Sequence, residues 1–326
     1  MHGRASDLDV DVNEVPERGH GQTPENPLRV VLALERTGSF GRAAQYLGIT
    51  QPGVSRALSR LETQYQSRLV ERGGKGVRLT AAGQGLIAHA RQLETTLRRA
   101  EESMRQIRGN RTGRISLGLS HGAIFQLLPR VIRRFRQLWP QVELQISTAT
   151  HPAVFGQLSD GSVDLAVLSL AETCLPDFYE ATPLMAGVLQ VIAPYGHPRS
   201  RVRRLARLHD EPWILPGPHS SITQALERAF IRLGLSRPLC TTYSYNLSGL
   251  QLLVASGEGF GLIPGGATGW PPGSPGSITR VPIQDLPDAP VLHLVRVAGV
   301  SLTPAGAALE RLLQEVNQPY ARSNLV

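Results

Sequence analysis

One face of the segment from Gln51 to Ser59 carries side chains that could read the edges of DNA bases. On a helix, Ser55 and Arg56 share this polar face with the two terminal residues. Glutamine can pair with adenine, arginine can hold guanine O6 and N7 with two hydrogen bonds, and serine can reach a base or a phosphate. The N-terminus of such a helix also attracts phosphate. The pattern therefore predicts base recognition in a DNA major groove.

The residues around this segment have the spacing of a helix-turn-helix. A first helix should start at the Asn26-Pro27 pair and stop at Gly38, and a second should run from a cap at Ser39 to Gly48. Thr50 should then cap the third helix, whose apolar stripe recurs at i, i+4 and i+7. The stripe consists of Val54, Leu58 and Leu61. The residues predicted to contact DNA from these helices are Ser39, Gln51, Pro52, Ser55, Arg56 and Ser59.

A hairpin should follow the third helix, because strand-like runs flank Gly-Gly-Lys-Gly at 73–76. Arg72, Lys75 and Arg78 on this wing are expected to contact phosphates or the minor groove, which adds affinity with little sequence information. A phosphate-binding P-loop is excluded, since Lys75 is followed by Gly76 rather than by Ser or Thr. The N-terminal part is thus expected to be an all-α winged helix-turn-helix.

A long helix should begin after Thr80 and carry a heptad seam, because its apolar residues are separated alternately by four and three positions. The seam residues are Leu86, Ala90, Leu93, Leu97, Ala100, Met104 and Ile107. Such a seam needs a partner helix, and the simplest partner is the same helix of a second subunit. Packing of the seam on its own chain is the alternative. A homodimer would also supply the paired half-sites that helix-turn-helix proteins bind.

Charge is unevenly distributed along the chain of 326 residues, whose net charge is +8. Residues 1–26 carry a net −4, residues 27–112 hold 15 basic and six acidic side chains, and residues 113–326 hold 17 and 14. A basic segment joined to a nearly neutral remainder is typical of a polyanion-binding module attached to another domain.

We expect four parts from the N-terminus to the C-terminus. They are an acidic disordered tail at 1–26, a winged helix-turn-helix at 27–80, a linker and dimerisation helix at 81–109, and a two-lobed α/β domain at 113–326. The last part is assigned as α/β because strand-like and helical stretches alternate in two successive sets. A strand at 291–296 and a helix after it should return the chain to the first lobe.

Several classes of protein are disfavoured by the composition. Cys174 and Cys240 are the only cysteines, too few for a disulfide framework or a four-cysteine metal site, and both are expected to be buried thiols. No apolar run approaches the roughly 18 residues of a membrane span, and the first residues lack a secretory apolar region. We therefore expect a cytoplasmic protein without a membrane partner, a metal or a cofactor.

Residues 28–83 resemble the DNA-binding segment of LysR-type transcriptional regulators. Gly-Ser-Phe, Ala-Ala, Gln-Pro-x-x-Ser-Arg, Leu-Glu, Arg and Leu-Thr-x-x-Gly occur in the order of that family. Residues 113–316 resemble the family's effector domain more loosely. The stretch QYQSRLVER departs from the pattern, since family members carry Leu-Gly and then Phe there, but the change affects packing of the wing and removes no proposed contact.

The resemblance implies a transcriptional regulator whose two lobes are similar to periplasmic binding proteins and hold a small effector in a cleft. It also implies homodimers, and in this family such dimers often pair into homotetramers. Loops after the strands would supply the effector contacts. The candidates are Ser120, His121, Thr150, His151, Ser220, Ser221 and Asn246. Their hydroxyl, imidazole and amide groups favour an anionic ligand such as a carboxylate or a sulfonate.

Two other functions remain open at this point. Gly118 to Gly122 match the G-x-S-x-G nucleophile elbow of serine hydrolases, and Asp285, Asp288 and His293 follow in the required order. The elbow would lie on the first strand of its lobe, however, with no earlier strand to supply the second oxyanion donor. An architectural DNA-binding protein without an effector is the other alternative, but such a protein does not need a two-lobed domain.

Overall fold

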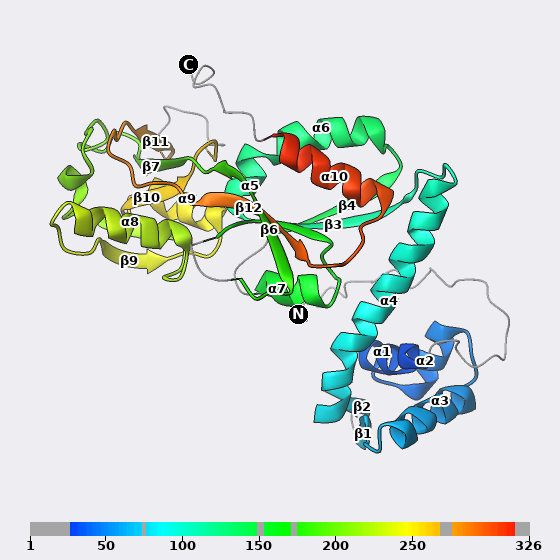
Figure 1. Ribbon diagram of the computed structural model, residues 1–326. Coiled ribbons are helices and arrows are strands. Elements are labelled where there is room, and N and C mark those ends of the chain that lie inside the picture. Colours follow the sequence, from blue (N-terminus) through cyan, green and yellow to red (C-terminus); the bar gives the residue numbers. More distant parts are fainter. Residues whose placement is uncertain (1–26, 74–75, 149–152, 171–174, 268–275, 317–326) are drawn as a thin grey trace, which may run out of the picture. The chain divides into compact units, whose positions relative to one another are not determined.

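The chain forms two compact units, one up to Arg98 and the other from Arg99 onward. Helix α4 (Ala81–Ile107) contributes residues to both units. The computed structural model describes residues 27–73, 76–148, 153–170, 175–267 and 276–316 (Figure 1).

The first unit is a winged helix-turn-helix, as the sequence predicts. Its elements before α4 are α1 (Leu28–Thr37), α2 (Phe40–Leu47), α3 (Gln51–Gln64), β1 (Val70–Gly73) and β2 (Gly76–Leu79). The core joins buried side chains of all three helices, including Leu34, Phe40 and Leu61. The two strands pair antiparallel, with Val70 opposite Leu79. Because the buried residues of each helix recur at helical spacing, each helix turns one face to this core.

The second unit begins with a lobe built on a five-stranded sheet of order β4-β3-β5-β12-β6. Strands β3, β4 and β5 are mutually parallel, and β12 is antiparallel to its neighbours β5 and β6. The strands are β3 (Gly113–Leu119), β4 (Val142–Thr148), β5 (Leu165–Ser169), β6 (Tyr179–Ala186) and β12 (Val291–Val297). The helices are α5 (His121–Gln126), α6 (Leu128–Leu138), α7 (Ala153–Ser159) and α10 (Pro304–Glu315).

The second lobe contains another five-stranded sheet, of order β11-β7-β10-β8-β9. Strand β8 is parallel to β9 and β10, whereas β7 runs antiparallel to β10 and β11. The strands are β7 (Leu189–Pro194), β8 (Pro212–Leu215), β9 (Leu239–Tyr243), β10 (Phe260–Pro264) and β11 (Ile278–Val281). The helical segments are η1 (Leu205–Leu208), α8 (Ser221–Arg232) and α9 (Leu247–Ala255).

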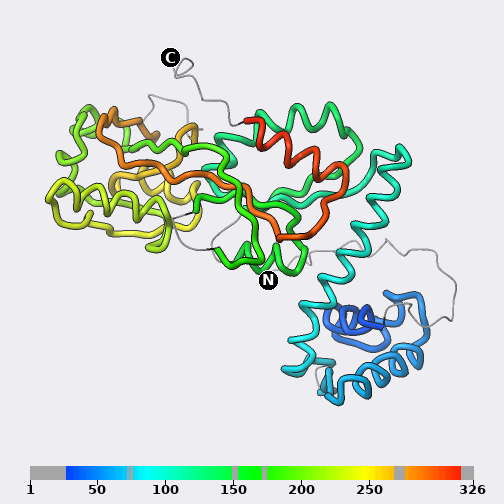
Figure 2. The backbone as a smooth tube through the Cα atoms, viewed as in Figure 1, coloured from blue at the N-terminus to red at the C-terminus, as the bar shows by residue number. Residues whose placement is uncertain are grey.

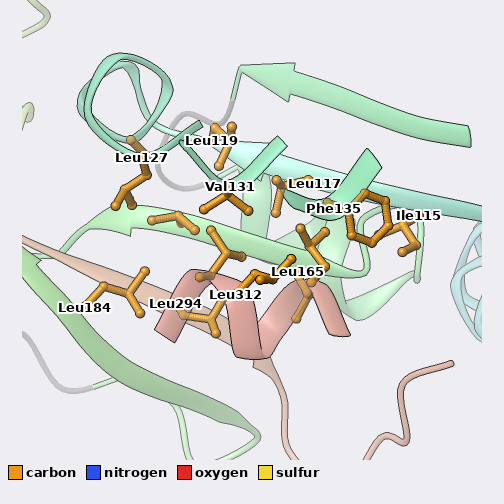
Figure 3. Close-up of a cluster of buried hydrophobic side chains, with 14 of the residues drawn as sticks. Ile115, Leu117, Leu119, Leu127, Val131, Phe135, Leu165, Leu184, Leu294 and Leu312 are labelled. Atoms are coloured by element: carbon orange, nitrogen blue, oxygen red, sulfur yellow. The ribbon is translucent and has the colours of Figure 1, made fainter. Parts of the chain in front are cut away.

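The path of the chain connects the two lobes twice (Figure 2). It leaves the first lobe after β6 and returns from the second lobe into β12. In the first lobe, α6 and α10 pack on one face of the sheet and α7 packs on the other. Figure 3 shows the larger of these cores, in which Phe135 of α6 and Leu312 of α10 meet Ile115 and Leu117 of β3. The predicted two-lobed α/β architecture is therefore confirmed.

Some local expectations differ from the structure. The sequence does not predict strands β6 and β11, and both are edge strands of their sheets. Cys240 is only partly buried, which corrects its assignment to the core, and Cys174 lies outside the described residues. The acidic tail at 1–26 is also outside the described residues.

Candidate DNA-binding surface and effector site

The recognition helix α3 is held by a cap and by its apolar stripe. The hydroxyl oxygen of Thr50 accepts a hydrogen bond from the Gly53 backbone N–H at 3.2 Å, as expected of an N-cap. The turn before it depends on Gly48, whose φ of 65° is in the left-handed region that favours glycine. Val54 is fully buried, and Leu58 and Leu61 are at most 5% exposed.

The opposite face of α3 is open to solvent. Gln51, Pro52, Arg56 and Ser59 are exposed and Ser55 is partly buried. Within the described residues, the Arg56 guanidinium has no ion-pair or hydrogen-bond partner. The structure thus brings together the side chains that the sequence assigns to base reading.

Ser39 does not play the capping role expected of it. It occupies the N-cap position of α2, with φ of −154°, but its side chain makes no cap hydrogen bond. The hydroxyl of Thr37 instead donates to the Ser39 carbonyl oxygen at 3.2 Å. The side chain of Ser39 is therefore not committed to the helix end.

The wing is hydrogen-bonded to the turn between α1 and α2. The Val77 N–H donates to the Gly38 carbonyl oxygen at 3.0 Å. Gly76, with φ of 117°, approaches so closely that an added Cβ would lie 2.7 Å from the same oxygen. Arg78 is exposed and pairs across the hairpin with Glu71. Lys75 and the side chain of Arg72 lie outside the described part of the chain.

Helix α4 makes ion pairs in each unit. In the first unit, Arg91 contacts Glu35 of α1 at 2.6 Å. In the second unit, Arg99 contacts Asp164 at 2.6 Å, and these two side chains are only 12% and 9% exposed. The other carboxylate oxygen of Asp164 accepts the Ser116 N–H of β3 at 2.7 Å.

A second buried contact joins the C-terminal part of α4 to the first lobe. The amide oxygen of Gln106 accepts the Ala305 N–H at the start of α10, and its nitrogen donates to the Thr112 carbonyl oxygen, both at 3.0 Å. Since Gln106 is 6% exposed, these bonds form where water is largely excluded.

The heptad seam is only partly available to a partner. Ala90 is completely buried within its own chain, and Leu86 packs against the helix-turn-helix core. Ala90 therefore stabilises its own subunit and is not available to a dimer partner, whereas Leu86 is only partly buried. The large seam residues further along are 42–70% exposed: Leu93, Leu97, Met104 and Ile107. Ala100 is also exposed.

Ser120 and His121 lie at the carboxyl end of β3, where α5 begins. The Ser120 hydroxyl oxygen is buried and has no hydrogen-bond partner among the described residues. It occupies the N-cap position of α5 but makes no cap hydrogen bond. Because a buried hydroxyl without a partner is costly, this atom is suited to a ligand. Thr150 and His151 lie outside the described residues.

In the second lobe, two of the three candidate side chains cap the N-termini of helices. The Ser220 hydroxyl accepts from the Ile222 N–H at 3.3 Å, and the Asn246 side-chain oxygen accepts from the Ser248 N–H at 2.9 Å. Ser221 is the first residue of α8. Their positions after the neighbouring parallel strands β8 and β9 are as expected, but the side chains of Ser220 and Asn246 already serve as caps.

Two residues of α5 that the sequence did not assign to the effector lie close to the second lobe. The Gln126 side-chain nitrogen donates to the Val188 carbonyl oxygen at 3.2 Å, while its side-chain oxygen is buried without a partner among the described residues. A Cβ added at Gly122 would lie 3.5 Å from Leu292 of the first lobe and 4.0 Å from Pro264 of the second lobe. Only the fold reveals these contacts, because they join segments distant in sequence.

The acidic and histidine residues of the hydrolase alternative form contacts with groups other than Ser120. The ring nitrogen Nδ1 of His293 lies 3.1 Å from the Val291 carbonyl oxygen. Asp285 accepts the Leu205 N–H, and Asp288 contacts Arg232. None of these bonds involves Ser120, so the geometry gives the hydrolase alternative no support.

Two family profiles match the chain. Residues 26–84 match the bacterial regulatory helix-turn-helix protein, lysR family, and residues 108–318 match the LysR substrate binding domain. The chain belongs to the LysR family. It is a DNA-binding transcriptional regulator with a substrate-binding domain for an effector. None of the helices in the described part of the chain combines the length and the hydrophobicity that a membrane span requires.

Similar LysR-type proteins cover most of the chain. The RuBisCO operon transcriptional regulator of Allochromatium vinosum is 29% identical over 298 residues, which are 90% of this chain and 97% of that protein. The SDS degradation transcriptional activation protein of Pseudomonas sp. is 28% identical and covers 73% of this chain and 78% of its own length.

Solved LysR structures share the fold. CbnR matches with a TM-score of 0.68 at 18% identity, over 90% of this chain and 99% of CbnR. A full-length OxyR variant from Pseudomonas aeruginosa matches with a TM-score of 0.65 at 23% identity, over 89% of this chain and 93% of its own. The winged helix-turn-helix, long helix and two-lobed domain are thus the architecture of the LysR family.

The environment of His121 predicts a pH dependence of stability. Burial lowers the pKa of its imidazole below the usual value, so the folded protein keeps the ring neutral when the unfolded chain takes up a proton. The free energy of unfolding should therefore fall as the pH drops below about 6.5. His121→Gln should show a smaller loss of melting temperature than the wild type between pH 7.5 and 5. The exposed His219→Gln variant serves as the control, and identical losses in His121→Gln and the wild type would contradict the assignment.

Proposed function

We propose that this LysR-type regulator reads its operator through the exposed face of α3. The observation that carries the proposal is the separation of the two faces: the apolar stripe is buried, while Gln51, Arg56 and Ser59 are exposed on a capped helix. Arg56 can hold a guanine edge with two bonds, and Gln51 at the helix start can pair with adenine. Pro52 and Ser55 complete this surface at the N-terminal end of the helix.

The wing and the start of α2 supply contacts that do not depend on sequence. Arg78 on the exposed side of the hairpin, together with Arg72 and Lys75, would contact phosphates or the minor groove. Ser39, whose hydroxyl is not used as a cap, would reach a phosphate beside the groove. With DNA as its partner, the regulator would act in the cytoplasm.

Two subunits are proposed to associate through the second half of α4. Leu93, Leu97, Met104 and Ile107 expose apolar side chains at heptad spacing, and the same helix of a second subunit would cover them. The resulting two-fold symmetry would place two copies of α3 in successive major grooves. We propose that these dimers pair further into a homotetramer.

The effector is proposed to bind beside Ser120 at the carboxyl end of β3. The same strand is joined to α4 through the Ser116 N–H, Asp164 and Arg99. A ligand that shifts the lobes would therefore change the orientation of α4. Through α4 it would change the distance between the two DNA-reading helices of the dimer. By linkage, DNA must alter the affinity for effector by the factor by which effector alters the affinity for DNA.

Substitution of Arg56 tests base reading. Arg56→Ala should remove about 1–3 kcal/mol of discrimination at the base pair it contacts. Arg78→Ala is the matched control, which should weaken binding to all sequences and reduce the salt slope by about one unit. Both effects can be measured with a randomised duplex library and salt titrations. An equal loss on every sequence for Arg56→Ala would show that it is not a base reader.

Substitution in the seam tests dimerisation. Leu97→Asp should reduce the proposed homotetramer to a smaller assembly, because a carboxylate would be buried in the apolar interface between two α4 helices. Thr96→Asp, at an exposed position of the same helix that is not part of the seam, should leave the assembly unchanged. Sedimentation velocity measures the assembly of both variants, and an assembly of unchanged size in Leu97→Asp would show that the seam does not join two subunits.

Ser120 is proposed to contact the effector without acting as a nucleophile. Wild-type protein and Ser120→Ala should hydrolyse activated esters such as p-nitrophenyl acetate at the same background rate. Turnover that disappears in Ser120→Ala would instead establish an esterase.

A further inference from the structure

The second lobe contains an arginine-rich segment that neither DNA reading nor effector binding explains. Residues 197–211 hold five arginines and two acidic residues. The rest of the stretch from 113 to 326 holds 12 basic and 12 acidic side chains. The whole charge excess of residues 113–326 therefore comes from this one segment.

Part of this segment borders a hollow of about 790 Å³ in the surface of the second lobe. We call it the arginine hollow, and its lining includes Tyr195, Ser200, Arg201, Arg203, Thr279 and Arg280. Its lining comes from residues that follow β7 and from residues of the edge strand β11. Strands β7 and β11 are neighbours in the sheet. No acidic side chain belongs to the lining.

The three arginines of the hollow carry charges that the described residues do not neutralise. Arg201, Arg203 and Arg280 are exposed, and the described part of the chain offers their side chains no ion pair. Arg199, in the same segment, provides the contrast, because it contacts both Asp210 and Glu211. Three like charges around one concavity repel one another unless an anion lies between them.

The arginine hollow is separate from the proposed effector site. Strand β7 pairs Leu189 with Pro264, which lies near α5 of the first lobe, and pairs Pro194 with Ile278 at its other end. The hollow is at the Pro194 end. The length of β7 therefore separates the two sites, roughly 17 Å at about 3.4 Å per residue.

We propose that the arginine hollow binds a small molecule with at least two phosphate groups. Arginine guanidinium groups hold phosphate oxygens with paired, charge-assisted hydrogen bonds, and three of them match a multiply charged anion better than a single carboxylate. The hydroxyls of Ser200 and Thr279 add donors, and the half-exposed Tyr195 ring can cover a planar base. The regulator would thus respond to a second, phosphorylated ligand.

The test is a calorimetric titration of the full-length protein with inorganic tripolyphosphate at 150 mM salt. A saturating DNA duplex is bound first, so that the basic winged helix-turn-helix is occupied. The variant Arg201→Gln, Arg203→Gln, Arg280→Gln should lose about ten-fold or more in affinity. A matched variant, Arg133→Gln, Arg237→Gln, Arg311→Gln, loses the same charge from exposed positions elsewhere and should change by less than about two-fold.

Two outcomes would overturn the proposal. One is a wild-type protein that does not bind tripolyphosphate, and the other is an equal loss of affinity in both triple variants. If the hollow variant instead loses affinity for DNA alone, the surface is a DNA contact and the proposal is wrong. Should the triple variant not fold, Arg280→Gln on the exposed edge strand replaces it and should still weaken tripolyphosphate binding.

A parallel titration with ATP identifies the source of the phosphate groups. Tighter binding of ATP that is lost in Tyr195→Ala indicates a nucleotide, whereas equal binding of ATP and tripolyphosphate indicates recognition of the phosphates alone. Both results support a polyphosphate site. DNA recognition by α3 does not depend on either result, so this proposal can fail while the proposed function stands.

Discussion

The burial of one stripe of α3 is the constraint on which the DNA-binding surface depends. Val54, Leu58 and Leu61 each contribute about 1.5–3 kcal/mol by leaving water, so a rotation of the helix that exposed them would cost several kcal/mol. The helix therefore has one stable orientation against α1 and α2. That orientation leaves Gln51 and Arg56 in solvent, and the position of every base-reading side chain follows from it.

A second constraint acts at the other end of α4. The Arg99–Asp164 pair is nearly buried, and Asp164 also accepts a backbone N–H of β3. Removing one partner of a buried ion pair typically costs about 3–5 kcal/mol, because the other charge is left uncompensated. The final turns of α4 therefore belong structurally to the first lobe, as the Gln106 contact with α10 also indicates. The unit that binds effector thus includes the end of the helix that leads to the DNA-binding unit.

The sequence predicts the helix-turn-helix well because its signals are local. The caps, the positive-φ glycines and the helical stripe lie within a few residues of one another. The sequence does not predict strand β6, because Pro183 interrupts it, and a proline is tolerated there since β6 is an edge strand opposite an irregular point of β12. Ala90 fits the heptad spacing, yet its burial within its own chain depends on tertiary packing. The contacts of Gln126 likewise join residues far apart in sequence.

The central claim is that the exposed face of α3 distinguishes one DNA sequence from another. Its most direct test is the affinity of the purified protein for a duplex selected from a random library, compared with a shuffled duplex of the same composition at physiological salt. If the exposed face of α3 reads bases, the protein should prefer the selected duplex by about a thousand-fold or more. Equal affinities for the selected duplex, the shuffled duplex and heparin would show that the protein responds to charge alone, and would contradict the account.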